Sequence, residues 1–191
     1  MSMHFSTHLD ACIACLPALK SLTPRVEAAV TLLISALTNN TPVLVCGNGG
    51  SAADAQHISG ELVGKFLLER SAFNVRALSC DTSILTAWAN DVHYDTVFSR
   101  QVEAYGQAGG VLWAISTSGN SKNVIEAAKQ AKQMGLSVLG MTGQTGGGLA
   151  PLCDVLLNAP SSSTPRIQEM HQILYHYVCQ EIEASLANTS K

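Results

Sequence analysis

The sequence predicts an α/β fold built on a parallel β-sheet. Short apolar runs alternate along the chain with segments of helical length, which is the pattern of strands joined by crossover helices. The chain has 191 residues, of which 47% are hydrophobic and 13% are charged, enough to bury a sizeable core. No internal repeat or linker-like segment divides it. We therefore expect one domain spanning residues 1–191.

Five segments have the length and composition of buried strands. They are residues 43–46, 74–78, 111–115, 137–141 and 154–157. Most are short apolar runs without a regular polar alternation, as expected for parallel strands covered on both faces.

Helical segments precede the first strand and separate the later ones. Two come before the first strand, at about residues 7–20 and 24–38. The others lie near residues 51–67, 83–89, 95–104, 121–134 and 165–186. Within residues 24–38, Val26, Val30, Leu33 and Leu37 recur at helical spacing, which indicates a face that packs in the core or against another subunit.

The composition excludes several classes of function. The net charge is −3 and no run of five like charges occurs, so we expect no binding to nucleic acid. No apolar run reaches the roughly 18 residues of a membrane span, and the N-terminus lacks the charged segment of a signal peptide. The six cysteines lie mostly in apolar stretches, unlike a disulfide scaffold. We expect a cytoplasmic protein with reduced thiols, and no membrane partner.

The loop after the first strand is rich in glycine. Ligands of open parallel sheets bind outside the carboxyl ends of the strands, and Gly47-Asn48-Gly49-Gly50-Ser51 stands at such an end. Its glycines allow a ligand close to the backbone, and Ser51 can cap the next helix. A tight turn with a cap is an equally ordinary explanation. Neither GxGxxG nor GxxxxGK[ST] occurs, which disfavours dinucleotides and nucleoside triphosphates.

The loop after the third strand is the stronger signal. Ser116-Thr117-Ser118-Gly119-Asn120-Ser121 combines four hydroxyl groups with a glycine and a new helix N-terminus, a set of donors that suits phosphate. The simpler interpretation is a serine-rich turn in which Ser118 or Asn120 is the N-cap. Between the two loops, Asn90 and Asp91 either bind sugar hydroxyls or form an ordinary turn.

Acid, base and ligand groups occur in two helical segments. His57 and Glu61 are four residues apart and share a helix face, which suits metal ligation, acid–base work or a surface ion pair. In the last helix, His176 lies about 80° from Gln168, about 20° from Glu169 and about 140° from His171. Helical spacing therefore pairs His176 with Glu169 before Gln168, and indicates that one of the two histidines is structural.

Four motifs together resemble one family. They are CGNGGSAADAQHISGEL, NDVHYDTVFSRQVEA, STSGNSKNVIEAA and RIQEMHQILYH. They are similar to the sugar isomerase (SIS) domain family, and specifically to its sedoheptulose-7-phosphate isomerases, also called phosphoheptose isomerases. The resemblance extends over nearly the whole chain.

The resemblance implies a fold, an assembly and a set of site residues. The fold would be a flavodoxin-like three-layer sandwich, in a homotetramer with active sites between subunits, to which residues 1–40 would contribute packing. The substrate contacts would be Asn48, Gly49, Gly50, Ser51, Glu61, Asn90, Asp91, Ser116, Thr117, Ser118, Ser121 and Gln168. The ligands of one zinc ion per subunit would be His57, Glu61, Gln168 and His176. The family thus selects Gln168 over Glu169.

The chemistry implied by the resemblance is an aldose–ketose isomerisation through an enediol. Glu61 and His176 would be the catalytic acid–base pair, and the metal would polarise the carbonyl oxygens. The substrate would be sedoheptulose 7-phosphate, a phosphorylated seven-carbon sugar, and the product D-glycero-D-manno-heptose 7-phosphate. This is the first step toward the ADP- or GDP-heptose precursors of lipopolysaccharide or a similar glycan.

One departure and one alternative accompany this interpretation. Some members have an aspartate three residues before the glutamine, where this chain has Pro165, so a contact from that position is lost or replaced. The alternative is a non-catalytic SIS protein that binds a partner such as the replication initiator DnaA. A binding scaffold has no need for an acid–base pair, so the presence of Glu61 and His176 favours the enzyme.

Overall fold

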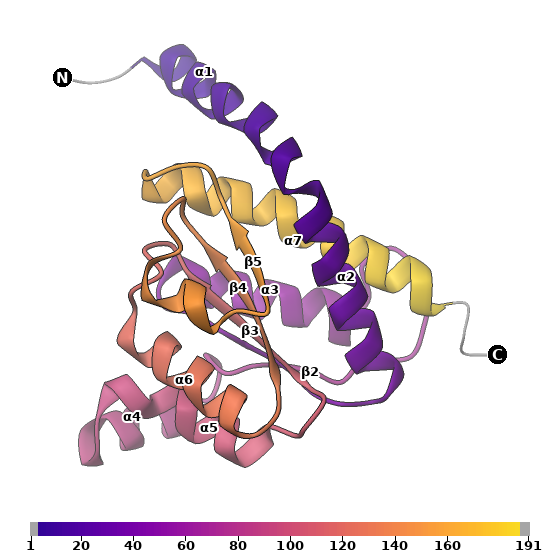
Figure 1. Cartoon of the computed structure of the whole chain (residues 1–191), viewed down its shortest axis with the longest axis vertical. Coiled ribbons are helices and arrows are strands. Elements are labelled where there is room, and N and C mark those ends of the chain that lie inside the picture. The colour runs from indigo at the N-terminus through magenta and orange to yellow at the C-terminus, as the bar shows by residue number, and fades with distance from the viewer. Residues whose placement is uncertain (1–3, 188–191) are drawn as a thin grey trace.

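A five-stranded parallel sheet forms the centre of the molecule (Figure 1). The computed structural model describes residues 4–187. The strand order is β2-β1-β3-β4-β5, the flavodoxin-like order, which confirms the predicted fold class. The strands are β1 (Val43–Cys46), β2 (Val75–Ala77), β3 (Val111–Ser116), β4 (Ser137–Thr142) and β5 (Val155–Asn158).

The helices match the predicted segments except at some ends. They are α1 (Phe5–Cys15), α2 (Thr23–Thr38), α3 (Gly50–Val63), α4 (Thr82–Asp91), α5 (Val97–Tyr105), α6 (Lys122–Gln133) and α7 (Thr164–Leu186). Three 3₁₀ segments accompany them: η1 (Leu16–Leu22), η2 (Tyr94–Thr96) and η3 (Gly147–Leu152).

The prediction that the third helix continues to residue 67 is wrong. Helix α3 ends at Val63, and Gly64 follows as its C-cap. The backbone N–H groups of Phe66, Leu67 and Leu68 donate to the carboxylate of Glu183 on α7. This long-range carboxylate replaces the carbonyl acceptors that a longer helix would offer.

Two apolar layers enclose the sheet. Val43 and Val45 of β1 point into a core formed with α2, α3 and α7, and Leu44 and Cys46 point into a second core formed with α5 and α6. This alternation is the two-residue period of a strand. All four residues of β1 are buried, so the fold is a three-layer sandwich with helices on both faces.

The two N-terminal helices differ in how far they are buried. In α2, Val26, Leu33 and Leu37 are buried and Val30 packs against them, which confirms the expected apolar face. Helix α1 has no buried residue and extends away from the body of the molecule (Figure 1). Across residues 4–187, no helix combines the length and apolarity needed to cross a membrane.

The sheet places one crevice between β1 and β3. These strands are neighbours, yet the chain leaves β1 toward β2 and leaves β3 toward β4. Connections that diverge in this way open a gap at the carboxyl ends of the two strands, where α/β proteins bind ligands. The glycine loop after β1 and the serine loop after β3 both begin there.

Candidate active site

The loop after β1 is held across the crevice by a pair of amides. Asn48 and Asn123 exchange two hydrogen bonds of 2.8 and 2.9 Å between their side chains. The hydroxyl of Tyr94 on η2 donates to Asn48 Oδ1 at 2.9 Å. The carboxyl ends of β1 and β3 are thereby fixed relative to each other. Asn123 and Tyr94 stand outside the predicted set, because sequence spacing does not reveal partners 75 and 46 residues away.

Two glycines of this loop have different surroundings. Gly49 has φ +56°, a conformation that side chains rarely adopt. A Cβ atom on Gly50 would lie 2.1 Å from Nε2 of Gln168, so the amide of Gln168 on α7 lies against the start of α3. Ser51, the next residue, is buried at the start of α3.

The loop after β3 has the features of an anion site. Ser116 is 4% exposed at the end of β3, and its hydroxyl lies 3.0 Å from that of Ser121. The N-cap of α6 is Ser121, so the alternative interpretation with Ser118 or Asn120 as the N-cap is wrong, and the Ser121 side chain makes no capping bond. Without that cap, the first N–H groups of α6 and the positive end of its dipole are available to an anion.

A small hollow of about 130 Å³ adjoins this loop. Thr117 and Ser118 line it on one side. Gly143, Gln144 and Thr145 after β4 and residues before α7 complete its wall. Hydroxyl-bearing side chains from three loops thus line one small hollow near the carboxyl ends of β3 and β4.

Asn90 and Asp91 lie at the C-terminal end of α4. Both are exposed, and Asn90 Nδ2 donates to Asp91 Oδ1 at 2.8 Å. The chain continues from them into η2, whose Tyr94 binds Asn48. This path places the pair on the segment that flanks the loop after β1, without a direct bond to that loop in the described residues.

Three groups with metal-ligand chemistry meet between α3 and α7. His57 Nε2 lies 2.9 Å from Glu61 Oε1, and the ring centroids of His57 and His176 are 5.0 Å apart. One ligand atom from each of His57, Glu61 and His176 lies within 4.8 Å of the others. Two imidazoles and a carboxylate form a donor set typical of zinc. We call these three residues the His57 cluster.

The surroundings of His176 favour its neutral form. Partial burial, together with the nearby His57, lowers the pKa of His176, and Glu61 opposes this shift. A neutral imidazole has a free lone pair, which both a metal ligand and a general base require. Phe66, from the loop after α3, packs near the ring with a centroid distance of 6.0 Å.

Two further residues support the His57 cluster from behind. The hydroxyl of Tyr175 lies 2.9 Å from His57 Nδ1, and Asp54 is buried one turn before His57 on α3. Sequence reasoning missed both. Tyr175 is part of an apolar helical run, and only the packing of α7 on α3 shows that its hydroxyl meets a histidine.

Gln168 stands one turn after the first residues of α7, and its amide lies against the start of α3. It is eight residues before His176 on α7, which corresponds to about 12 Å along a helix, and it contacts Gly50. The pairing of His176 with Glu169 that helical spacing allowed is absent, because Glu169 binds Arg166 at 2.6 Å.

The prediction that one histidine of α7 is structural is confirmed. His171 is fully buried, and its Nε2 lies 3.0 Å from the carbonyl oxygen of Thr142 at the end of β4. Burial lowers the pKa of His171 to about 4, so the ring is neutral at physiological pH.

A second group of potential metal ligands already contacts a positively charged side chain of the protein. His8, Cys12 and Glu169 approach one another between α1 and α7. The guanidinium of Arg166 contacts all three side chains. Because this internal cation occupies the centre of the group, a metal ion would have to displace it. The His57 cluster is the better metal site.

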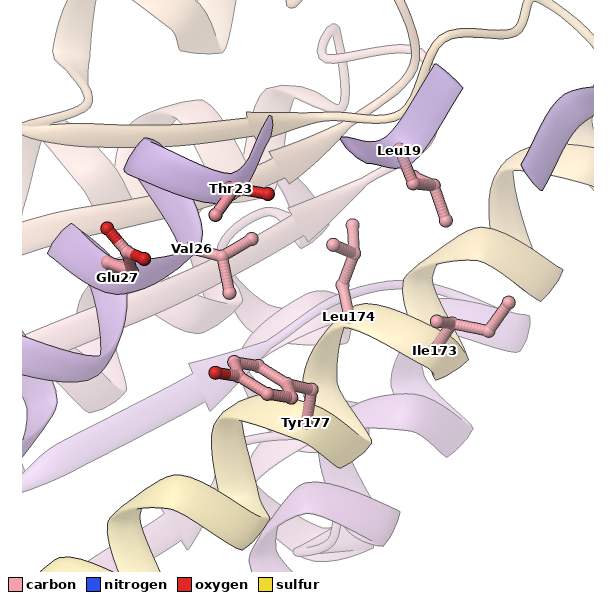
Figure 2. Close-up of a pocket in the computed structure, with 7 residues that line it drawn as sticks. All are labelled: Leu19, Thr23, Val26, Glu27, Ile173, Leu174 and Tyr177. Carbon is pink, nitrogen blue, oxygen red and sulfur yellow. The ribbon is translucent and has the colours of Figure 1, made fainter. Parts of the chain in front are cut away.

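A further hollow lies away from these residues, between α2 and α7 (Figure 2). Its volume is about 350 Å³, and its wall is mostly apolar. Leu19, Val26, Ile173 and Leu174 point into it from the two sides. It contains none of the predicted site residues, so it is a packing surface rather than a site of acid–base chemistry.

Known proteins share both the sequence and the fold. The sequence profile of the SIS domain family matches residues 8–143. A phosphoheptose isomerase of Helicobacter pylori (strain Shi470) is 51% identical over 170 residues, covering 89% of this chain and 88% of the relative. The chain belongs to the phosphoheptose isomerase family of SIS-domain proteins.

Solved structures of phosphoheptose isomerases have the same architecture. That of Neisseria gonorrhoeae is 44% identical and superposes with a TM-score of 0.89, covering 94% of this chain and 96% of the other. That of Francisella tularensis is 32% identical with a TM-score of 0.91 and the same coverage. Beyond residue 143, β5 and α7 pack on the same core, and α7 supplies His176.

Proposed function

We propose that this protein is an aldose–ketose isomerase that converts sedoheptulose 7-phosphate to D-glycero-D-manno-heptose 7-phosphate. The observation that carries the proposal is the His57 cluster, where a carboxylate and two imidazoles meet in a member of the phosphoheptose isomerase family. The serine loop after β3 supplies a separate phosphate site at the crevice.

The reaction moves one hydrogen between neighbouring carbons of the sugar. Glu61 removes the proton from carbon 1 of the ketose, while the carbonyl oxygen at carbon 2 gains a proton, giving the enediol. A proton then returns to carbon 2, and the hydroxyl at carbon 1 gives up its proton to become the aldehyde. His176 is the second member of the acid–base pair and transfers the protons of the two oxygen atoms.

Zinc is the cofactor that fits this chemistry. His57, Glu61 and His176 would hold it, and when bound it would polarise the carbonyl group of the sugar. His57 then serves as a ligand only, since the opposite edge of its ring is bound to Tyr175.

The other end of the substrate is bound by hydroxyl groups and backbone. Ser116, Thr117, Ser118 and Ser121, with the N-terminus of α6, hold the phosphate. Asn48, Ser51, Asn90 and Asp91 bind the hydroxyls of the carbon chain, and Gly49 and Gly50 leave room for it. This division anchors one end of the sugar while carbons 1 and 2 react at the other.

A homotetramer with active sites between subunits accounts for three features of the single chain. Helix α1 has no buried residue. Ile173 and Tyr177 are each 47% exposed beside the apolar hollow between α2 and α7. The amide of Gln168, a proposed zinc ligand, lies against Gly50 in the single chain, and a neighbouring subunit would complete the site around it. Residues 1–40 thus serve assembly.

The free thiols support a cytoplasmic location. All six cysteines are free, which suits the reducing cytoplasm. The alternative of a non-catalytic partner of the initiator DnaA leaves the convergence of Glu61, His57 and His176 without a purpose.

A direct assay tests the proposal. Purified protein incubated with zinc and sedoheptulose 7-phosphate is expected to form an aldose heptose phosphate, detected by chromatography and mass-matched standards. Isomerisation of ribulose 5-phosphate or fructose 6-phosphate to the corresponding aldose phosphate is not expected. Complete inactivity toward the seven-carbon substrate with zinc supplied would support the binding scaffold instead.

A further inference from the structure

Three residues of α3 and one of α7 form a continuous polar chain. Asp54, His57 and Glu61 lie on one face of α3, spaced by three and four residues. Tyr175 is fully buried on α7, and its hydroxyl lies 2.9 Å from His57 Nδ1. The rings of Tyr175 and His57 meet edge to face at 71°, with centroids 5.4 Å apart. The hydroxyl therefore approaches the ring nitrogen that points away from Glu61.

Asp54 lies near the tyrosine hydroxyl. Its side chain is buried, at 6% exposure, and its atom Oδ2 has no hydrogen-bond partner within residues 4–187. Burial and the nearby Asp54 carboxylate raise the pKa of Tyr175, so the hydroxyl keeps its proton. A buried carboxylate attracts the positive end of a neighbouring O–H group, because water does not screen the charge.

The charge of Asp54 favours one direction for the hydrogen bond between Tyr175 and His57. A tyrosine hydroxyl has one proton, and an ionised carboxylate only accepts. When the hydroxyl proton is turned toward Asp54, the hydroxyl oxygen accepts from His57, which requires the ring proton on Nδ1. The reverse order, with the hydroxyl donating to Nδ1, would turn this proton away from the negative charge.

The assignment has a consequence on the opposite edge of the ring. With the proton on Nδ1, His57 presents the lone pair of Nε2 toward Glu61 Oε1, 2.9 Å away. Two acceptors at this distance need a cation to bridge them. His176 faces the same point, since its ring centroid is 5.0 Å from that of His57. The tyrosine and the aspartate therefore prepare the cluster for a metal ion.

We propose that Tyr175 and Asp54 are positioning residues that hold His57 in its Nδ1–H tautomer and aim Nε2 at a shared metal ion. Carboxylate groups that orient metal-binding histidines are a general feature of metal sites. Here the carboxylate acts through a tyrosine hydroxyl. The inference rests on the proposed zinc site, and it adds two residues that touch neither the metal nor the sugar.

The first test measures zinc affinity by chelator competition, without any turnover. Tyr175→Phe keeps the buried ring and removes only the hydroxyl. We expect it to bind zinc about 10- to 100-fold more weakly than the wild type. Tyr177→Phe is the matched control, because Tyr177 is on the same helix but lines the hollow between α2 and α7. Equal zinc affinity in the wild type and Tyr175→Phe would overturn the proposal.

The second test observes the tautomer directly in the metal-free protein. Nitrogen-15 shifts of the His57 ring, assigned by their loss in His57→Ala, are expected to show Nδ1–H in the wild type and a mixture of tautomers in Tyr175→Phe and Asp54→Asn. Unchanged shifts in a folded Tyr175→Phe protein contradict the proposal, even if Asp54→Asn does not fold.

These readouts separate this inference from the isomerase assignment. A protein that binds zinc through an oriented His57 but leaves the sugar phosphate unchanged would refute the function and retain the positioning role. If the wild type isomerises the sugar but Tyr175→Phe binds zinc as tightly as the wild type, the function is retained and the positioning role is refuted. Activity provides one further check: excess zinc should restore turnover in Tyr175→Phe, which a merely destabilised fold would not show.

Discussion

At the scale of single residues, α7 carries two histidines with opposite roles. His176 reaches the His57 cluster, and His171 is enclosed between α7 and the end of β4. The Nδ1 atom of His171 is buried without a hydrogen-bond partner in the described residues. A charged ring at this position would have one unsatisfied donor, which explains why burial lowers its pKa to about 4.

His171 makes stability depend on pH. Its ordinary pKa is 6.5, and the folded value is about 4. The unfolded chain therefore binds the proton more readily, so the stabilisation is complete above pH 6.5 and is lost as the pH falls toward 4. The full shift corresponds to roughly 3 kcal/mol.

We expect His171→Gln, which retains a neutral donor, to weaken this pH dependence. Urea unfolding of both proteins at pH 7 and pH 5 measures it, with His4→Gln as an exposed control. An identical loss of stability in the wild type and His171→Gln between these pH values would show that His171 does not contribute.

At the scale of elements, the loop between α3 and β2 is anchored by one buried side chain. Glu183 on α7 accepts three backbone N–H groups, from Phe66, Leu67 and Leu68. The Arg70 guanidinium lies 3.2 Å from the same carboxylate and also binds the carbonyl oxygen of Glu61 at 2.7 Å. Glu183 thus positions the loop that places Phe66 beside His176.

Glu183→Gln is expected to destabilise the fold by roughly 1–3 kcal/mol at pH 7, because the amide cannot accept all of these donors. Burial alone raises the pKa of Glu183, but the three N–H groups and Arg70 more than offset this and hold it below its ordinary value of 4.5. The stabilisation is therefore complete above pH 4.5 and is lost as the pH falls through the folded value.

Urea unfolding at pH 7 and at pH 4 measures this difference. The gap between wild type and Glu183→Gln should be smaller at the lower pH. Glu103→Gln, which removes an exposed surface ion pair, is the control and should change little. A gap that is the same size at both pH values would contradict the assigned role.

The elements also show how far sequence reasoning extends. Strands β1, β3 and β4 were predictable because a short continuous apolar run between two turns is typical of a buried parallel strand. The pairing of His57 with Glu61 followed from helical spacing, because both are on α3. The loop after α3 was not predictable: its acceptor, Glu183, is more than 110 residues away.

Contacts between residues distant in sequence were equally unpredictable in the candidate active site. Periodicity shows which residues share a face of one helix, but it does not show which element lies opposite. Tyr175, Asn123 and Tyr94 therefore looked like ordinary helix or turn residues. Gln168 is the converse case: the family motif groups it with His176, whereas helix geometry separates the two by about 12 Å in one chain.

At the scale of the whole molecule, the exposed apolar surface predicts assembly. Phe5, Leu9 and Ile13 of α1 are exposed, as is Ile173 on α7. We expect Ile173→Asp to shift the protein from a tetramer to smaller species, because a charge in a buried contact is unfavourable. Light scattering after gel filtration measures the mass. Lys129→Asp on α6, on the other face of the sheet, is the control. A monomeric wild type would refute the assembly.

The central claim is that the carboxylate of Glu61 transfers the proton between the sugar carbons. Its most direct test compares the rate of conversion of sedoheptulose 7-phosphate by the wild type, Glu61→Gln and Glu69→Gln, each supplied with zinc. Glu69 is an exposed glutamate beyond the end of α3, and its substitution should preserve activity. We predict that Glu61→Gln remains folded and loses about 10²- to 10⁴-fold in turnover. A Glu61→Gln protein that isomerises the sugar at the wild-type rate would contradict the mechanism.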